Sequence, residues 1–265
     1  MSESSEPAIM ARLNPFRSAL GLRVSFPGPG QARVDADPSP ASLGDDGCIA
    51  PGVLLTLIDI ALGHAIASRL PEPSSFATVS LQILVRSAWP TGPLSAVASA
   101  APLASDWREG AAEGAVYASS GNLVATAQGY FARGAGAGRH LSPAQDDAEG
   151  FASFRELLGA RDADGALALA IEHRHLNPDG VMHGGAMAAF LDEAMRAGLR
   201  KDGATPGRLG SFSIRYLLPG RPGPLRAVPR IERHGRRIHF ASALALAEEG
   251  SLLATAEATY LEDLG

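Results

Sequence analysis

The strongest constraint on the fold of this chain is an internal repeat that runs through most of its length. The segment FRSALG from Phe16 returns as FRELLG from Phe154, 138 residues later. Near the other end of each copy, GNLVATAQGYF from Gly121 returns as GSLLATAEATY from Gly250, 129 residues later. A period this long excludes a solenoid of short repeats and predicts a pair of similar domains.

Two landmarks between these ends keep the same order. The apolar segment ending in Asp59 returns before Asp192, and GPLSAV from Gly92 returns as GPLRAV from Gly223. The spacing falls slowly along the chain, which indicates a duplication followed by small deletions in loops. We therefore predict an N-terminal domain over residues 12–134, a linker rich in Gly, Ala, Ser and Pro over 135–148, and a C-terminal domain over 149–263.

Composition narrows the class of protein. With 46% hydrophobic and 19% charged residues, the 265-residue chain is expected to be a soluble globular protein. The net charge of −5 leaves no basic surplus for a nucleic acid partner. The single cysteine excludes an internal disulfide, and the first 16 residues lack the apolar core of a signal peptide. We predict a cytoplasmic protein.

Each copy shows the same order of expected elements. A short helix, opened by Asn14-Pro15 in the first copy, precedes an extended segment and then a long apolar helix. Asp59 in the middle of the first long helix argues against a membrane span. The fold class is therefore predicted as α+β, two domains in tandem, each an antiparallel sheet wrapped around a central helix. We expect long helices at 52–70 and 184–200 and four strands per copy, at 78–85, 94–101, 114–120 and 123–131, and at 211–218, 225–232, 237–246 and 252–260.

One motif in the second copy carries a family resemblance. The segment NPDGVMHGGAMAAFLD, from Asn177 to Asp192, resembles the Asn-x5-His-Gly-Gly motif of hotdog-fold acyl-CoA thioesterases of the phenylacetate-pathway type. In the first copy the motif is eroded, since Gly44, Ala50 and Pro51 replace the Asn, His and Gly, although Asp59 is retained. The resemblance implies a double hotdog, in which two joined copies imitate the homodimer of the family.

The chemistry of the motif suits thioester hydrolysis. A helix N-terminus offers unpaired N–H groups at its positive end, so Gly184 and Gly185 are expected to hold the developing oxyanion and let the acyl group approach. Asn177 can donate from its side-chain amide. Asp192 cannot be the base for the same carbonyl, because eight residues of helix separate it from Gly184 by about 12 Å.

The carboxylate is therefore expected to come from the other copy. If the two long helices pack antiparallel, Asp59 faces the start of the second helix, which gives one composite site with Asn177, His183 and Gly184. The family commonly adds a hydroxyl on the following strand, for which Thr78 is our candidate, with Ser80 as the alternative. A second site at Asp192 would face Gly44, Ala50 and Pro51, and is expected to be degenerate and inactive.

Other interpretations of these residues stay open. His183 can cap the helix, and Asp192 lies near Glu193 and Arg196, which suggests a solvated face. His173 and His175, expected on one strand face, could bind a metal with His183, but we predict no metal. Arg236 and Arg237 form either an ordinary hairpin loop or a contact to the phosphates of coenzyme A.

The sequence thus predicts a thioester hydrolase that acts on a medium-chain or aromatic acyl-CoA by carboxylate-assisted attack of water. We expect no cofactor, coenzyme A entering only with the substrate, no membrane partner, and a homodimer of double hotdogs packed back to back. Two alternatives remain. The first is a hydratase or dehydratase of acyl thioesters, for which Asp179 lies four residues before His183, and the second is an acyl-CoA-binding protein without catalysis.

Overall fold

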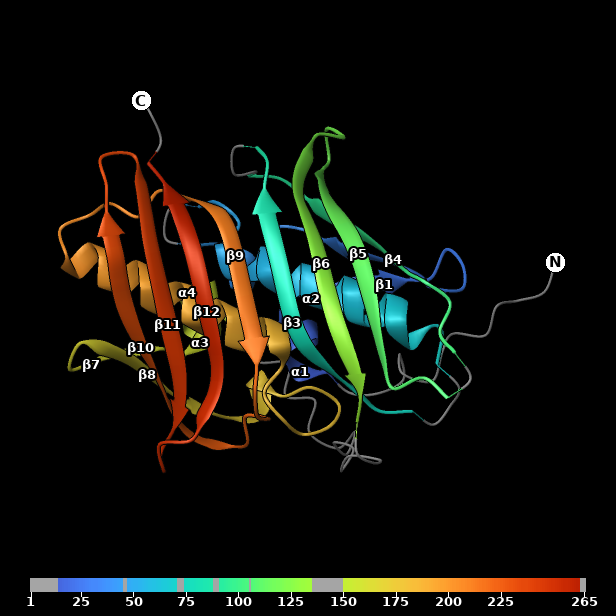
Figure 1. The fold of residues 1–265 in the computed structure, drawn as a ribbon. Coiled ribbons are helices and arrows are strands. Elements are labelled where there is room, and N and C mark those ends of the chain that lie inside the picture. Colours follow the sequence, from blue (N-terminus) through green and yellow to red (C-terminus); the bar gives the residue numbers. More distant parts are fainter. Residues whose placement is uncertain are drawn as a thin grey trace.

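The computed structural model describes residues 14–44, 47–70, 74–87, 91–104, 106–134 and 150–262. Twelve strands form one antiparallel sheet, and two long helices, α2 (Pro51–Ala67) and α4 (Gly184–Lys201), lie on the same face of it. Each helix covers one half of the sheet, and the two overlap near its middle (Figure 1). The linker expected at 135–148 and the outermost residues of the two expected domains lie outside the described residues. Among those residues, no helix has both the length and the hydropathy that a bilayer crossing requires.

The sheet repeats one strand order outward from its middle. Its first half runs β3, β6, β5, β4, β2, β1 and its second half runs β9, β12, β11, β10, β8, β7, with β3 and β9 paired at the seam. The strands of the first half are β1 (Arg23–Ser25), β2 (Gln31–Ala36), β3 (Phe76–Val85), β4 (Leu94–Ala100), β5 (Glu109–Ala118) and β6 (Leu123–Arg133). Those of the second half are β7 (Arg161–Ala163), β8 (Ala166–Ile171), β9 (Arg208–Tyr216), β10 (Gly223–His234), β11 (Ile238–Ala247) and β12 (Leu252–Leu261).

The expectation of four strands per copy was therefore too low. The extended segment after each short helix pairs with the sheet as two more strands, β1 and β2 in the first half and β7 and β8 in the second. These strands are only three and six residues long, so sequence periodicity carries little signal for them. The remaining elements are the short helices α1 (Pro15–Ala19) and α3 (Phe154–Leu158) and the 3-10 helices η2 (Pro40–Ser42) and η4 (His173–His175).

The two long helices differ in how their apolar residues are distributed. Helix α2 is apolar on every side, with all positions from Gly52 to Ile66 buried, because the sheet covers it on one side and α4 on another. Helix α4 is amphipathic. Its last turn carries the basic residues Arg200 and Lys201, whose positive charges interact favourably with the negative end of the helix dipole.

Glycines set the distance between these helices. A Cβ atom at Gly185 would lie 2.5 Å from Cα of Thr56 in α2, and a Cβ at Gly52 would lie 2.6 Å from Cβ of Ala189 in α4. From Gly52 to Thr56 the residue numbers rise along α2, while those of their partners fall from Ala189 to Gly185 along α4. The two helices therefore pack antiparallel. Gly185 is thus required for helix packing, whereas the sequence suggested that it leaves room for an acyl group.

Gly185→Ala tests this packing. Since the added methyl group meets backbone rather than a movable side chain, we expect a loss of about 1–3 kcal/mol in the free energy of unfolding, measured by urea denaturation. The matched control is Gly63→Ala, also buried in a long helix, where the nearest atom to the new Cβ is 3.5 Å away in Phe76. The control should be neutral or slightly stabilising. Equal stability of the two variants would contradict the packing argument.

Candidate active site

A buried carboxyl group joins the two halves of the molecule. Asp59 in the middle of α2 is 6% exposed. The Gly185 N–H at the start of α4 donates to its Oδ2 over 2.9 Å, and the Thr78 hydroxyl of β3 donates to its Oδ1 over 3.1 Å. The structure therefore places the carboxylate of one half at the helix N-terminus of the other, which is the arrangement that antiparallel helices were expected to produce.

A β-bulge turns Thr78 toward this carboxyl group. Along β3 the side chains of Leu81 and Ile83 are buried, and the ladder to β6 shifts by one residue between Thr78 and Ser80. Because of this shift Thr78 lies opposite the fully buried Phe131, on the inner face of the sheet, while Ser80 lies opposite the exposed Tyr130. Of the two candidate hydroxyls, Thr78 is the one that contacts Asp59.

The environment of Asp59 places its titration close to neutral pH. Burial raises the pKa of this carboxyl group from 3.8 to about 6, and the hydrogen bonds from Thr78 and Gly185 partly oppose that effect. A carboxyl group with a pKa near 6 can both accept and release a proton under physiological conditions. Its protonation state can therefore change within the physiological pH range.

His183 serves as the N-cap of α4. Its Nδ1 accepts a hydrogen bond from the Gly185 N–H over 3.0 Å and lies 3.4 Å from Oδ2 of Asp59. Burial lowers the pKa of His183 to about 3, with smaller contributions from the neighbouring His64 and Arg17 side chains, which disfavour a second positive charge. The imidazole is therefore neutral, with the proton on Nε2, and it forms no ion pair with Asp59 at neutral pH despite the short distance.

The two glycines of the motif have separate partners. Gly185 gives its N–H to Asp59 and His183, so this donor is occupied, whereas the sequence assigned it to an oxyanion. Gly184 lies directly against the carboxyl group, since a Cβ there would be 2.7 Å from Oδ2 of Asp59. Its carbonyl accepts a hydrogen bond from the Tyr216 hydroxyl of β9 over 2.9 Å. Tyr216 was not among the residues expected from the sequence.

Asn177 lies in the turn that precedes α4. Its Oδ1 accepts from the backbone N–H groups of Asp179 over 2.9 Å and Val181 over 3.3 Å, which fixes the orientation of the side-chain amide. The turn is held against the start of α4 because the His183 N–H donates to the carbonyl of His175. His175 lies on η4 rather than on a strand, and the part of the chain that the structure describes contains no cluster suited to a metal ion.

The matching position in the other half has become a structural ion pair. Asp192 is 2% exposed, accepts from Nε of Arg196 over 2.8 Å and from the Tyr260 hydroxyl over 2.8 Å. The Arg196 guanidinium lies over the Tyr260 ring at 4.8 Å and donates to the Gly207 carbonyl. Arg196 therefore marks a buried pair and not a solvated face. The spacing of Asp192 and Arg196, four residues apart on one helix, is the sequence feature that could have predicted this ion pair.

This second position also lacks the other groups of the site. Leu209 pairs with Tyr260 in the ladder as Thr78 pairs with Phe131, so an apolar side chain replaces the hydroxyl. Beside Gly52, the ring of Phe154 and the methyl group of Ala189 occupy the surroundings of the helix start. The geometry is consistent with the expected degeneracy at Gly44, Ala50 and Pro51.

The expected phosphate contacts lie far from Asp59. Arg236 and Arg237 form the turn between β10 and β11, next to His234, whose Nδ1 is 3.6 Å from Asp202 at the end of α4. The 18 residues of α4 separate this turn from Gly184 by about 25 Å of helix rise. The structure thus does not bring the two arginines to the composite site.

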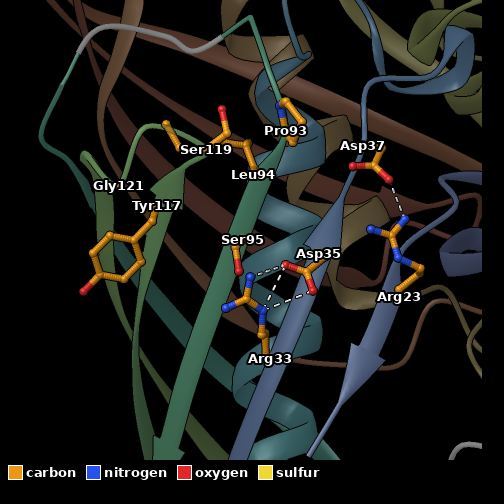
Figure 2. Close-up of a pocket in the computed structure, with 11 residues that line it drawn as sticks. Arg23, Arg33, Asp35, Asp37, Pro93, Leu94, Ser95, Tyr117, Ser119 and Gly121 are labelled. Atoms are coloured by element: carbon orange, nitrogen blue, oxygen red, sulfur yellow. Dashed lines mark hydrogen bonds and ion pairs between the residues drawn. The ribbon is translucent and has the colours of Figure 1, made fainter.

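Two hollows in the surface lie on the outer face of the sheet, away from the helices. One of about 340 Å³ is lined by the ion pairs of Arg23 with Asp37 and of Arg33 with Asp35 (Figure 2). The other, of about 530 Å³, crosses the seam near Leu84 and Phe240. Neither is lined by Asp59, His183 or Gly184.

Comparisons with known proteins agree on the type of domain. Residues 179–254, which contain the start of α4, match the family described as Thioesterase superfamily. No curated protein matches the chain in sequence.

Solved structures share the fold over nearly the full length. A candidate thioesterase from Novosphingobium aromaticivorans is 19% identical, with a TM-score of 0.64 over 91% of this chain and 98% of its own. The 12:0-ACP thioesterase from Umbellularia californica is 14% identical, with a TM-score of 0.63 over 88% and 95%. A candidate oleoyl thioesterase from Lactobacillus plantarum is 11% identical, with a TM-score of 0.64 over 93% and 100%. The chain therefore has the hotdog-like fold of thioesterases, an antiparallel sheet around helices.

Asp59→Asn should stabilise the protein at neutral pH. Because the pKa of this carboxyl group is about 6 in the folded state and about 3.8 when unfolded, the folded state retains the proton longer, and stability falls as the pH rises from about 4 to 6. The asparagine side chain does not titrate, so the variant does not lose this stability. We expect its free energy of unfolding to be about 1–3 kcal/mol higher than that of the native protein at pH 8. The difference should shrink toward pH 4 in urea denaturation.

The control is Asp192→Asn, which removes the counter-charge of the buried Arg196 and should destabilise the protein by about 3–5 kcal/mol at pH 8. Asp59→Asn behaving like this control at pH 8 would show that the Asp59 carboxylate is a stabilising group and not a strained functional one.

Proposed function

We propose that this protein is an acyl-CoA thioesterase with one composite active site between the halves of a double hotdog of the phenylacetate-pathway type. The observation that carries the proposal is the buried Asp59 carboxyl group, with a pKa near 6, held against the glycine N-terminus of α4. Natural proteins rarely bury an unpaired carboxyl group, which destabilises the fold, unless it has a functional role. The thioesterase-superfamily domain that contains this helix start supports the same conclusion.

The proposed reaction uses water as the nucleophile. Asp59 takes a proton from a water molecule, the water oxygen attacks the thioester carbonyl carbon, and the carbonyl π electrons move to the oxygen. In this proposal the Gly184 N–H and the side-chain amide of Asn177 stabilise the resulting oxyanion. Collapse of this intermediate breaks the carbon–sulfur bond and expels the thiolate, which receives the proton from Asp59. Direct attack by the carboxylate, giving an anhydride that water then hydrolyses, uses the same groups.

The other residues of the site act on Asp59. Thr78 donates to Oδ1 of the carboxylate and Gly185 donates to Oδ2, so the carboxyl group has a fixed plane. His183 caps the helix as a neutral imidazole. The Phe16 ring lies 5.9 Å from that of His183. This apolar neighbourhood supports a medium-chain or aromatic acyl group as the substrate.

The carrier of the acyl group has two candidates. Coenzyme A is our first choice, and the likeness to the 12:0-ACP thioesterase favours an acyl carrier protein as the second. The mechanism calls on no metal or redox cofactor, so activity should survive EDTA. A hydratase and a non-catalytic binder are the remaining alternatives, and a panel of acyl-CoAs distinguishes them. Hydrolysis releases thiol, hydration changes the acyl chain without releasing thiol, and a binder does neither.

The sharpest test compares the two aspartates. Asp59→Asn should lower kcat for thiol release by at least about a hundredfold, the usual scale for a positioned general base. Asp192→Asn should change kcat by less than about fivefold, because its neighbours form no oxyanion site. Since Asp192→Asn leaves Arg196 unpaired, the double variant Asp192→Asn/Arg196→Gln serves as a second measure. Equal losses at both aspartates would contradict a single active site.

We further propose a cytoplasmic homodimer that packs through the outer face of the sheet. This face carries exposed apolar side chains, of which Leu84 is 51%, Leu244 43% and Phe240 40% exposed. Light scattering at micromolar concentration should give about twice the 27.3 kDa of one chain. A mass equal to a single chain would contradict the dimer, and Leu244→Lys should separate it if this face is the interface.

A further inference from the structure

One hydroxyl group near the carboxyl group has no role in the proposed reaction. Tyr216, at the end of β9, extends its side chain to the start of α4, where its hydroxyl donates to the Gly184 carbonyl over 2.9 Å. Burial, and the nearby charge of Asp59, raise the pKa of this phenol well above 10. Tyr216 is therefore a neutral hydrogen-bond donor at neutral pH.

The bonded carbonyl belongs to the same peptide group that holds the carboxylate. The peptide between Gly184 and Gly185 presents its C=O to Tyr216 and its N–H to Oδ2 of Asp59 over 2.9 Å. Because a peptide group is planar, a hydrogen bond at one end fixes the direction of the other. A donor on the carbonyl also polarises the peptide and strengthens the bond that its N–H makes.

Glycine makes this fixation necessary. Neither Gly184 nor Gly185 has a side chain, and a Cβ atom at either position would meet Asp59 or Thr56 within 2.7 Å. The close approach of the helices thus demands two consecutive glycines at a helix start, where backbone freedom is greatest. A hydrogen bond from the sheet restores the order that the glycines remove.

We propose that Tyr216 is a positioning residue, which aims the Gly184–Gly185 peptide at Asp59 and so tunes the carboxylate that performs the reaction. This inference rests on the proposed hydrolase function. It assigns the tyrosine no contact with the substrate.

The repeat supplies an internal comparison. In the strand ladders Tyr216 lies opposite Ala254, and its counterpart in the other half, Val85, lies opposite Ala125. Valine cannot donate a hydrogen bond, so the equivalent position in the first half offers no hydroxyl to the start of α2. The tyrosine and the complete motif thus occur together, and both are absent from the degenerate site.

The charged groups around Asp59 make a pH experiment interpretable. His183 on α4 is neutral, as is His64 on α2, whose pKa burial lowers to about 4. Arg17 on α1 stays charged, and Tyr216 on β9 stays protonated. Asp59 is therefore the group in this cluster that titrates near pH 6. Since the Gly185 N–H lowers the pKa of this carboxyl group, weakening that bond must raise the pKa.

Tyr216→Phe tests the proposal against the control Tyr260→Phe, which removes the hydroxyl that Tyr260 donates to the Asp192 carboxylate in α4. For Tyr216→Phe we expect the apparent pKa on the acidic side of the pH profile of kcat/KM to rise by about 0.5 unit. A rise of this size corresponds to weakening one charged hydrogen bond by a fraction of its strength. At pH 8, kcat should fall about fivefold while KM stays within about twofold. The Tyr260→Phe control should have a lower Tm than the native protein, and the apparent pKa on the acidic side of its pH profile should not change.

Two results would overturn the proposal. The first is an unchanged apparent pKa in Tyr216→Phe with a lowered Tm, which indicates a structural role alone. The second is an equal shift in both variants. If the native protein releases no thiol from any acyl-CoA, the proposed function fails. A titration of the Asp59 carboxyl carbon by ¹³C NMR, assigned with Asp59→Asn, then still decides whether Tyr216 controls its pKa.

Discussion

The structure depends on the close antiparallel contact between α2 and α4. At the glycines of this contact, backbone of one helix meets backbone and side chains of the other, so a side chain in the middle of α2 can reach the start of α4. Asp59 uses that position, and its carboxyl group takes the N–H that a helix start leaves unpaired. The packing of the core and the geometry of the site are thus one interaction.

The two equivalent aspartates of the long helices, Asp59 and Asp192, have different partners. At one end a carboxyl group is buried beside neutral donors, Thr78, Gly185 and the nearby Tyr216, so burial raises its pKa. At the other end Asp192 has a guanidinium from Arg196 and a phenol from Tyr260, which satisfy its charge. Such a counter-charge offsets part of the free energy that burial of a carboxylate costs. The two equivalent positions therefore place a buried carboxyl group in two different electrostatic environments.

Several features followed from the sequence. The repeat predicted matching halves, the apolar run predicted a buried α2, and helix rise alone showed that Asp192 and Gly184 cannot share a carbonyl. Together with the assumption that the two long helices pack antiparallel, that argument predicted Asp59 opposite Gly184. Local sequence carried this information because helix periodicity and the distance between positions on a helix are short-range properties.

Only the tertiary structure decided the remaining points, because each depends on contacts between distant segments. A bulge in β3 selected Thr78 over Ser80, and burial made His183 a neutral cap. Arg196 proved to be buried against Asp192, and the length of α4 separated Arg236 from the site. The role of Gly185 in helix packing and the reach of Tyr216 from β9 also required the assembled fold. Sequence fixes which groups exist and their spacing along one element, whereas burial and register across elements set their partners, charge and orientation.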